Sequence, residues 1–393
     1  AALVTRWRRA TERLWPAGLL FGCLALTGIT SAAANFTSLP GLAGMVARGG
    51  VRPLLTMSII VLGYCLATGG RNRVLLLVQA CALSAVVHAV FAVICVLLPL
   101  EGPLGLGTVQ ASQQFRMDFW PWRATGMFGM GRANALGAHF AFFLPLAAIL
   151  LVEARNGLAK AGWLLGGSLL LAGVVATQTR ASMAAAALGL GLLGILSTDR
   201  RTRLWLLPLA AVGAIACALA LPLVASLETR RLTLFLAACG CCLRHPLFGV
   251  GPGRYVSEVR EMGGLETGLG LARHGAHNSF LTAGAEQGLL APLLIAGVAL
   301  LAVCWTRAML TGPRRSDRLS LGIAAAFAVF AVHNLTNNLF LNSTGTLTFW
   351  LLLGAVAHFA RSRPAPEGAG PDPESSPCSE AAGQPGTARA DCA

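Results

Sequence analysis

The side chains that could do chemistry in this sequence are a few arginines, one histidine and two asparagines, spread over four segments. They are Arg123 with Asn134, Arg180, the pair Arg230 and Arg231, and the pair His277 and Asn278. A guanidinium stays charged and donates two parallel hydrogen bonds to a phosphate. A histidine imidazole exchanges a proton near neutral pH. Together these groups suit the binding of a phosphate or pyrophosphate and the activation of a hydroxyl.

Composition places these residues in a membrane protein. The chain has 393 residues, of which 55% are hydrophobic and 12% are charged, whereas soluble domains carry about 25% charged residues. The apolar residues come in blocks of about twenty, the length that crosses a bilayer as a helix. This pattern excludes a disordered chain and a single water-soluble globule. The net charge of +14 suits the cytoplasmic loops of a membrane protein, so we expect no nucleic-acid partner.

The apolar blocks predict an all-α polytopic membrane protein with about ten spanning helices. The expected spans are residues 17–34, 53–69, 74–100, 133–152, 161–178, 181–198, 204–225, 279–306, 319–341 and 345–360. Residues 1–16 form a tail, residues 17–361 the membrane domain, and residues 362–393, rich in Pro, Gly and Ser, a disordered tail. The run Ser31-Ala32-Ala33-Ala34 resembles a signal-peptide cleavage site, but the spans that follow at once favour an uncleaved first helix.

Short basic loops predict the orientation. The clusters at Arg6–Arg13, Arg71–Arg73, Arg155–Lys160, Arg200–Arg203, Arg307–Arg318 and Arg361–Arg363 fall on one side of the expected spans. The positive-inside rule makes that side cytoplasmic, together with both termini. Two long loops, residues 101–132 and 226–278, then face the opposite side. All four segments with candidate residues share that side, so we expect one site near the outer headgroups.

An amphipathic helix is expected after Arg231. Its apolar stripe repeats at steps of three and four residues and consists of Leu232, Phe235, Leu236, Cys239 and Leu243. Pro246 and the glycines from Gly249 to Gly253 end the helix. Such a helix lies along the outer interface, and its N-terminus favours an anion.

Each candidate residue also has a structural interpretation. A single arginine near the headgroups commonly extends to lipid phosphates, and His88, His139 and His333 within spans are typical of packing residues. The polar patch of His333, Asn334, Asn337 and Asn338 either joins neighbouring helices or lines a sugar site. Histidine and cysteine spacing matches no metal site, so we expect no metal and no cofactor.

Sparse charge within the spans disfavours a transporter. Glu286 is the only acid in an expected span, and it lies near the outer end. A proton-coupled or ion-coupled transporter is expected to place acids near the midplane. A polysaccharide or lipid transporter is the alternative from a different functional class.

Several runs resemble the O-antigen ligase and polymerase superfamily. They are Arg231-Leu-Thr-Leu-Phe235, His245-Pro-Leu-Phe-Gly249-Val-Gly-Pro-Gly253, His277-Asn278-Ser279-Phe280-Leu281, Glu286-Gln-Gly288-Leu-Leu, Arg123-Ala-Thr-Gly126-Met-Phe128 with Asn134, and Thr179-Arg180. The resemblance covers about residues 120–300. It departs at Phe235, where tryptophan is common, and at Asn134, where the usual run is richer in asparagine. Ten spans are also fewer than the twelve of well-described ligases.

The resemblance implies a metal-independent GT-C-type glycosyltransferase in the bacterial inner membrane. Such an enzyme takes a glycan from undecaprenyl pyrophosphate on the periplasmic side. The acceptor is lipid A core in ligases, a second lipid-linked repeat in polymerases, and a protein hydroxyl in other relatives. The modest periplasmic loops favour O-antigen ligation over polymerisation of O-antigen or exopolysaccharide.

Residue roles follow from this hypothesis. Arg180 and Arg231 bind the pyrophosphate and stabilise charge on the leaving group, with Arg123 and Arg230 supporting the donor. His277 orients or deprotonates the acceptor hydroxyl. Asn278 holds the imidazole ring or a sugar hydroxyl, and Asn134 is a further substrate-binding residue.

Overall fold

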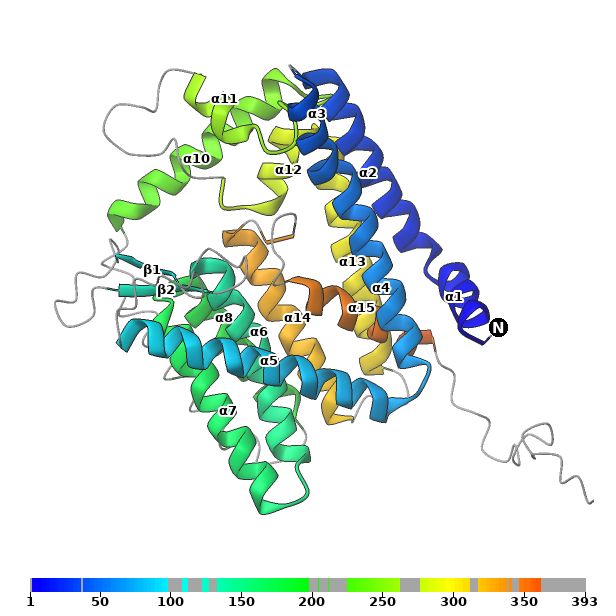
Figure 1. The fold of residues 1–393 in the computed structure, drawn as a ribbon, viewed down its shortest axis with the longest axis vertical. Helices are drawn as coiled ribbons and strands as arrows, with labels where there is room; N and C mark the ends of the chain where they lie inside the picture. The colour runs from blue at the N-terminus through cyan, green and yellow to red at the C-terminus, as the bar shows by residue number, and fades with distance from the viewer. Residues whose placement is uncertain are drawn as a thin grey trace, which may run out of the picture. The chain divides into compact units, whose positions relative to one another are not determined.

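The computed structural model describes residues 2–36, 38–97, 108–111, 122–126, 133–197, 204, 211, 225–261, 276–311, 317–337, 339–340 and 346–361. These residues are mainly helical (Figure 1). One antiparallel pair, β1 (Thr108–Ala111) with β2 (Trp122–Gly126), departs from the all-α expectation. Residues 1–361 form one compact unit, and the tail expected over 362–393 lies outside the described residues.

Seven segments of the described chain are long and apolar enough to cross a membrane. They are α2 (Trp15–Asn35), the run Pro40–Ala67, α5 (Arg71–Leu97), α6 (Ala133–Glu153), α7 (Gly157–Ala176), α13 (Leu290–Thr311) and the part Arg318–Leu335 of α14 (Arg318–Thr336). The run Pro40–Ala67 joins α3 (Leu39–Val46), a π-helical turn η1 (Ala47–Val51) and α4 (Arg52–Ala67). The chain is therefore a helical, polytopic membrane protein.

Six further helices lie in the described part of the chain. They are α1 (Ala2–Arg13), α8 (Arg180–Leu196), α10 (Ala225–Arg244), α11 (Tyr255–Glu261), α12 (Ser279–Gln287) and α15 (Leu347–Arg361). Helices α8 and α15 coincide with the expected spans 181–198 and 345–360, but they are shorter than 18 residues. The expected span 204–225 falls almost entirely outside the described residues.

The expected span 279–306 is wrong as a single helix. Helix α12 ends at Gln287, and α13 begins at Leu290. Between them Gly288 adopts φ +86°, and the backbone of Leu247 and Pro246 fills the space that a Cβ would need there. The break puts Glu286 outside the candidate spans, because α12 alone is too short to cross.

Helix α6 contacts α5, α7, α8 and α14 and carries much of the core. Its Leu136, Phe140 and Phe143 are fully buried. At Gly137 a Cβ would overlap the hydroxyls of Ser182 and Thr177. This glycine therefore lets the turn before α8 lie directly on α6, close to Asn134.

The most extensive contact joins α4 and α15. A Cβ on Gly63 would overlap the carbonyl oxygen of Leu351, and one on Gly354 would overlap that of Ile60. Close backbone approach at small residues is a common way for helices to associate in membranes. The pair fixes α15 against the N-terminal helices.

Candidate functional site

Two turns of unusual backbone geometry adjoin three of the residues predicted to do chemistry, Arg180, His277 and Asn278. Gln178 has φ 49° and His277 has φ 50°, and no other non-glycine residue in the described chain has a positive φ. A left-handed residue other than glycine costs about 1–2 kcal/mol, and such strain gathers at functional sites. Gln178 lies two residues before Arg180, and His277 directly precedes Asn278.

Asn134 ties the first of these turns to α14. Its Nδ2 donates a hydrogen bond to Oδ1 of Asn337 at 3.0 Å. Thr179 Oγ1 lies 3.4 Å from Oδ1 of Asn134 and 3.3 Å from the carbonyl oxygen of Ala133. Asn337 Nδ2 in turn lies 3.2 Å from Nδ1 of His333. The start of α6, the turn before α8 and the end of α14 therefore meet at one point.

The second turn reaches the same end of α14. Oδ1 of Asn278 accepts hydrogen bonds from the amides of Phe280 and Leu281 at 2.9 and 3.0 Å, and so caps α12. Its Nδ2 donates to the carbonyl oxygen of Leu335 at 3.1 Å. Both polar ends of the Asn278 side chain thus bind backbone groups and fix the segment that carries His277.

Ser279 connects the start of α12 to the asparagines at the end of α14. Its Oγ donates to Oδ1 of Asn334 at 2.8 Å and lies 3.4 Å from the carbonyl oxygen of Asn337. Phe340 donates its amide hydrogen to the same Asn334 oxygen at 2.8 Å. We call the connected set the asparagine cluster, and its members are Asn134, Thr179, Asn278, Ser279, Asn334 and Asn337.

The cluster brings three predicted segments together. It contains Asn134 and Asn278, and it adjoins Arg180 and His277 through the chain. Arg180 is the first residue of α8, and its Nε and Nη2 atoms are buried. The N-terminus of a helix favours an anion, so Arg180 and the α8 amides form a positively polarised corner beside the cluster.

The other predicted arginines are placed by backbone alone. Arg123 lies on β2, which packs against α5 and α6. Arg230 and Arg231 lie on α10, which packs against α12. Their side chains lie outside the described residues, so their contacts with the cluster stay a prediction.

Helix α10 has the predicted apolar stripe. Leu232, Leu236 and Leu243 are 58–79% exposed, and Cys239 is also exposed. The opposite face packs Leu234, Ala238 and Cys241 inward, and the Tyr255 hydroxyl donates to the carbonyl oxygen of Leu234 at 2.8 Å. The helix ends at Arg244, before Pro246, as expected, but it begins at Ala225, so the expectation that Arg231 lies at its N-terminus is wrong.

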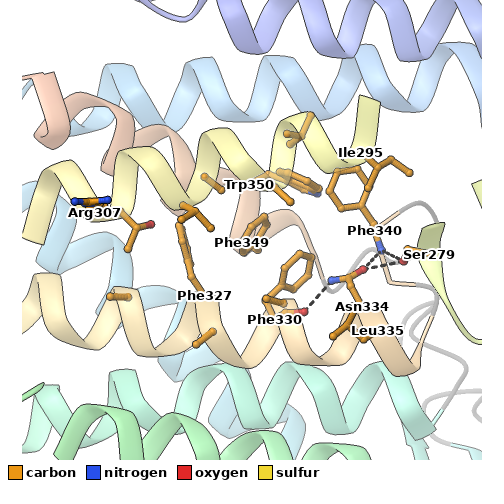
Figure 2. A pocket seen from close by; sticks show the side chains of 18 of the residues that line it. Ser279, Ile295, Arg307, Phe327, Phe330, Asn334, Leu335, Phe340, Phe349 and Trp350 are labelled. Carbon is orange, nitrogen blue, oxygen red and sulfur yellow. Dashed lines mark hydrogen bonds between the residues drawn. The ribbon is translucent and has the colours of Figure 1, made fainter. Parts of the chain in front are cut away.

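An apolar groove adjoins the cluster. A cavity of about 580 Å³ lies along α13 and α14, with Phe349 and Trp350 of α15 at its wall (Figure 2). Ser279 and Asn334 lie at one end and Arg307 at the other. The stretch of α13 from Ile295 to Thr311 is about 24 Å long, which exceeds one half of a hydrocarbon core of about 30 Å.

Sequence reasoning left Asn334 and Asn337 with two alternatives, joining neighbouring helices or lining a sugar site, and named Ser279 only within a motif. The available signal was the run from His333 to Asn337, in which polar side chains recur on one helical face. In the described residues no group of three or more His, Cys, Asp or Glu could hold a metal ion. Metal independence therefore stays a prediction.

Comparison with protein-family models finds no match, and comparison with curated proteins finds no match either.

Proposed function

We propose that the chain is a glycosyltransferase that takes a glycan from undecaprenyl pyrophosphate and transfers it to an acceptor hydroxyl. The reaction takes place at the periplasmic face of a bacterial inner membrane. The preferred acceptor is lipid A core, which makes the activity O-antigen ligation. The proposal includes a GT-C-type fold with about ten spans and both termini in the cytoplasm.

The single observation that carries this proposal is the asparagine cluster at the end of an apolar groove. An amphiphile with a long hydrocarbon chain and a polar head needs both features side by side. The groove lies between candidate spans and is lined almost entirely by apolar side chains. Its polar end meets Ser279 and Asn334, and Ser279 lies one hydrogen bond from Asn337, which in turn binds Asn134.

The corner at Arg180 supports binding of the pyrophosphate. A guanidinium and a helix N-terminus act together on an anion. Arg231 is assigned the same ligand and stabilises the charge that develops on the leaving group. Arg123 and Arg230 support the donor, and the exposed stripe of α10 lies in the membrane interface.

His277 is the proposed base or hydrogen-bond partner for the acceptor hydroxyl. Its left-handed backbone and the cap formed by Asn278 fix its place. Asn278 and Asn134 are positioning residues in this scheme, because their amide groups bind the protein itself.

The test is glycan transfer by the purified full-length chain in nanodiscs, with undecaprenyl-pyrophosphate glycan and lipid A core and with no ion gradient. We expect product from the wild type and from His245→Asn, the matched histidine control, and none from His277→Asn. Transfer by His277→Asn at the wild-type rate would refute the assignment. Absence of product with a wild type that moves donor between leaflets would favour a transporter.

Acceptor identity is read from surface polysaccharide in a deletion strain. Lipid A core without any attached glycan, restored by the wild-type chain alone, supports ligation. Core that carries single repeats supports polymerisation instead. Unchanged lipopolysaccharide contradicts both and points to exopolysaccharide or protein glycosylation.

A further inference from the structure

The glycine turn from Gly249 to Gly253 lies at the centre of a charged cluster that is distinct from the asparagine cluster. Val250 donates its amide hydrogen to the carbonyl oxygen of Ala285 at 2.9 Å, and Gly251 donates to that of Glu286 at 3.0 Å. Gly249 has φ +63° and lies so close to the Glu286 backbone that a Cβ would overlap it. The turn is thus held firmly against the end of α12.

Arg48 rests on the other end of this turn. Gly253 has φ +81°, and the Arg48 guanidinium occupies the space that a Cβ would fill. Arg254 is tied down nearby, because its Nη1 donates to the carbonyl oxygen of Asn35 at 2.8 Å. The Asn35 side chain in turn donates to the carbonyl oxygen of Gly249 at 3.1 Å. The hydrogen bond to Asn35 thus restrains the Arg254 guanidinium, and Arg48 lies against the turn beside it.

One carboxyl group faces these arginines. Glu286 accepts hydrogen bonds from the backbone amides of Gly253 and Tyr255, and it lies within electrostatic range of Arg48 and Arg52. Burial raises the pKa of this carboxyl to about 7, although the amides and the two guanidiniums oppose the rise. The guanidiniums of Arg48 and Arg52 therefore act on this one carboxyl group, and Arg254 adds a positive charge at the same turn, beside Gly251.

The position suits a ligand at the membrane surface. Arg48 and Arg52 are both exposed and stand one helical turn apart. They belong to the 28-residue run Pro40–Ala67, which is about 42 Å long and exceeds a hydrocarbon core of about 30 Å. The N-terminal part of this run therefore reaches the headgroup region, on the side that the basic loops predict to be the outer one.

We propose that Arg48, Arg52 and Arg254 form a binding site for a phosphate group at the outer membrane surface, with Glu286 orienting the turn beneath it. The Arg254 guanidinium is already held by its hydrogen bond to Asn35 and loses little freedom when it binds, which distinguishes it from an arginine that extends loosely to bulk lipid. Fork-shaped donors match phosphate oxygens. The phosphate belongs either to a lipid headgroup or to a soluble anion. The site is independent of the proposed transfer reaction.

The experiment measures binding by the full-length chain under two conditions. In phosphatidylcholine nanodiscs it is titrated with inorganic phosphate and with inorganic pyrophosphate. In mixed micelles it is titrated with phosphatidylglycerol against phosphatidylcholine, and retained lipid is counted by native mass spectrometry. Binding of the inorganic anions identifies a soluble source, and selective retention of phosphatidylglycerol identifies a headgroup.

The double variant Arg48→Gln/Arg52→Gln is expected to weaken binding of the active probe by about tenfold or more. The matched control Arg155→Gln/Lys160→Gln removes one cation from the α6–α7 connection and one from the first turn of α7, and it should leave affinity unchanged. Glu286→Gln keeps an oxygen for the Gly253 and Tyr255 amides but removes a negative charge, so it should bind the anion more tightly at pH 8. Wild-type affinity of the double variant for every probe, or an equal loss in the control, would overturn the proposal.

Discussion

His277 and Gln178 are two single residues whose strained backbone the surrounding structure maintains. Each holds a left-handed backbone without being glycine, and each lies beside the asparagine cluster. Hydrogen bonds on both sides maintain the geometry, with Asn278 capping α12 and Thr179 bound to α6. A substitution at His277 therefore has two separate effects, because it changes the backbone strain and it removes the imidazole.

Asparagine tolerates the left-handed region better than alanine does. We therefore expect His277→Asn to unfold near the wild-type temperature and His277→Ala to lose about 1 kcal/mol of stability. Both should lack glycan transfer, because both lack the imidazole. Thermal unfolding in detergent, run beside the transfer assay, checks this expectation. Full transfer by either variant would assign His277 a purely structural role.

The raised pKa of Glu286 makes the free energy of unfolding depend on pH, and the direction of the shift decides the sign of that dependence. Its pKa rises from an ordinary 4.5 to about 7 in the folded chain, so the folded state holds the proton more tightly between these values. Stability from this group therefore falls as pH rises from about 4.5 to 7. The groups that face it are the Arg48 and Arg52 guanidiniums, the Gly253 amide, and the Tyr255 amide and phenol.

Replacing Glu286 by glutamine should remove this dependence. The unfolding temperature of the wild type is expected to fall more between pH 5 and pH 8 than that of Glu286→Gln. The partly exposed position limits the difference to about 1–2 kcal/mol at pH 8. Parallel pH profiles for the two proteins would contradict the raised pKa.

At the scale of elements, the contact between α4 and α15 depends on two glycines. Gly354→Ala puts a methyl group onto the Ile60 carbonyl oxygen and the Tyr64 amide, and overpacking of this kind costs about 1–3 kcal/mol. Gly167→Ala on α7 is the control, since no atom lies within 4 Å of its Cβ position. We expect Gly354→Ala to lower the unfolding temperature and Gly167→Ala to leave it unchanged or raise it. If Gly354→Ala is as stable as Gly167→Ala, close packing at Gly354 is not what holds α4 and α15 together.

Hydropathy and helical periodicity predicted most of the elements. The apolar stripe and the stop at Pro246 predicted α10, and the candidate spans at the N-terminus follow block length. The break at Gly288 was missed because the apolar residues on both sides fill one continuous window. Gly288 is the residue in this window that indicates a helix break. The break is required because the Leu247 backbone packs against Gly288, and sequence spacing does not show that contact.

The asparagine cluster was predicted only in part for a related reason. Orientation rules put Asn134 and Asn278 on one side of the membrane, but they give no distances. Asn134 and Asn337 are 203 residues apart and are joined by a hydrogen bond between their side chains. Such a contact depends on how α6 and α14 pack, and Gly137 and the α8 turn help to set that packing.

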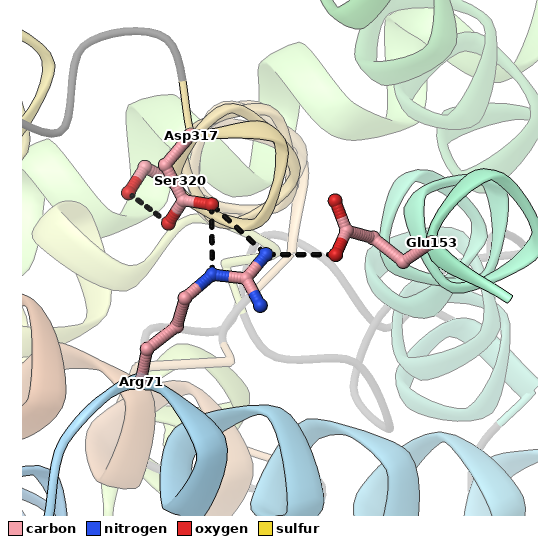
Figure 3. Close-up of polar contacts among 4 residues, drawn as sticks. All are labelled: Arg71, Glu153, Asp317 and Ser320. Carbon is pink, nitrogen blue, oxygen red and sulfur yellow. Dashed lines mark hydrogen bonds and ion pairs between the residues drawn. The ribbon is translucent and has the colours of Figure 1, made fainter. Parts of the chain in front are cut away.

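At the scale of the whole molecule, an ion-pair triad joins helices at the end of the bundle that the basic loops predict to be cytoplasmic. Arg71 on α5 binds Glu153 of α6 at 2.8 Å and Asp317, just before α14, at 3.0 Å (Figure 3). Ser320 donates a further hydrogen bond to Asp317 at 3.2 Å. The triad joins three helix ends, all of which the basic loops assign to the cytoplasm. The same orientation puts α10 and the asparagine cluster on the outer side.

Labelling of single cysteines tests this orientation directly. Arg155 and Arg244 are both exposed arginines, one in the α6–α7 connection and the other at the end of α10. In a background that replaces Cys239 and Cys304, the two exposed thiols of the described residues, and also Cys217, Cys378 and Cys392, which lie outside those residues, by serine, Arg244→Cys should react with an impermeant maleimide in intact spheroplasts. Arg155→Cys should react only after the membrane is permeabilised. Labelling of Arg155→Cys in intact cells, with Arg244→Cys protected, would invert the orientation and move the cluster to the cytoplasmic face. A lipid-linked donor on the periplasmic side would then have no access to His277, so the outcome decides whether the proposed reaction is possible.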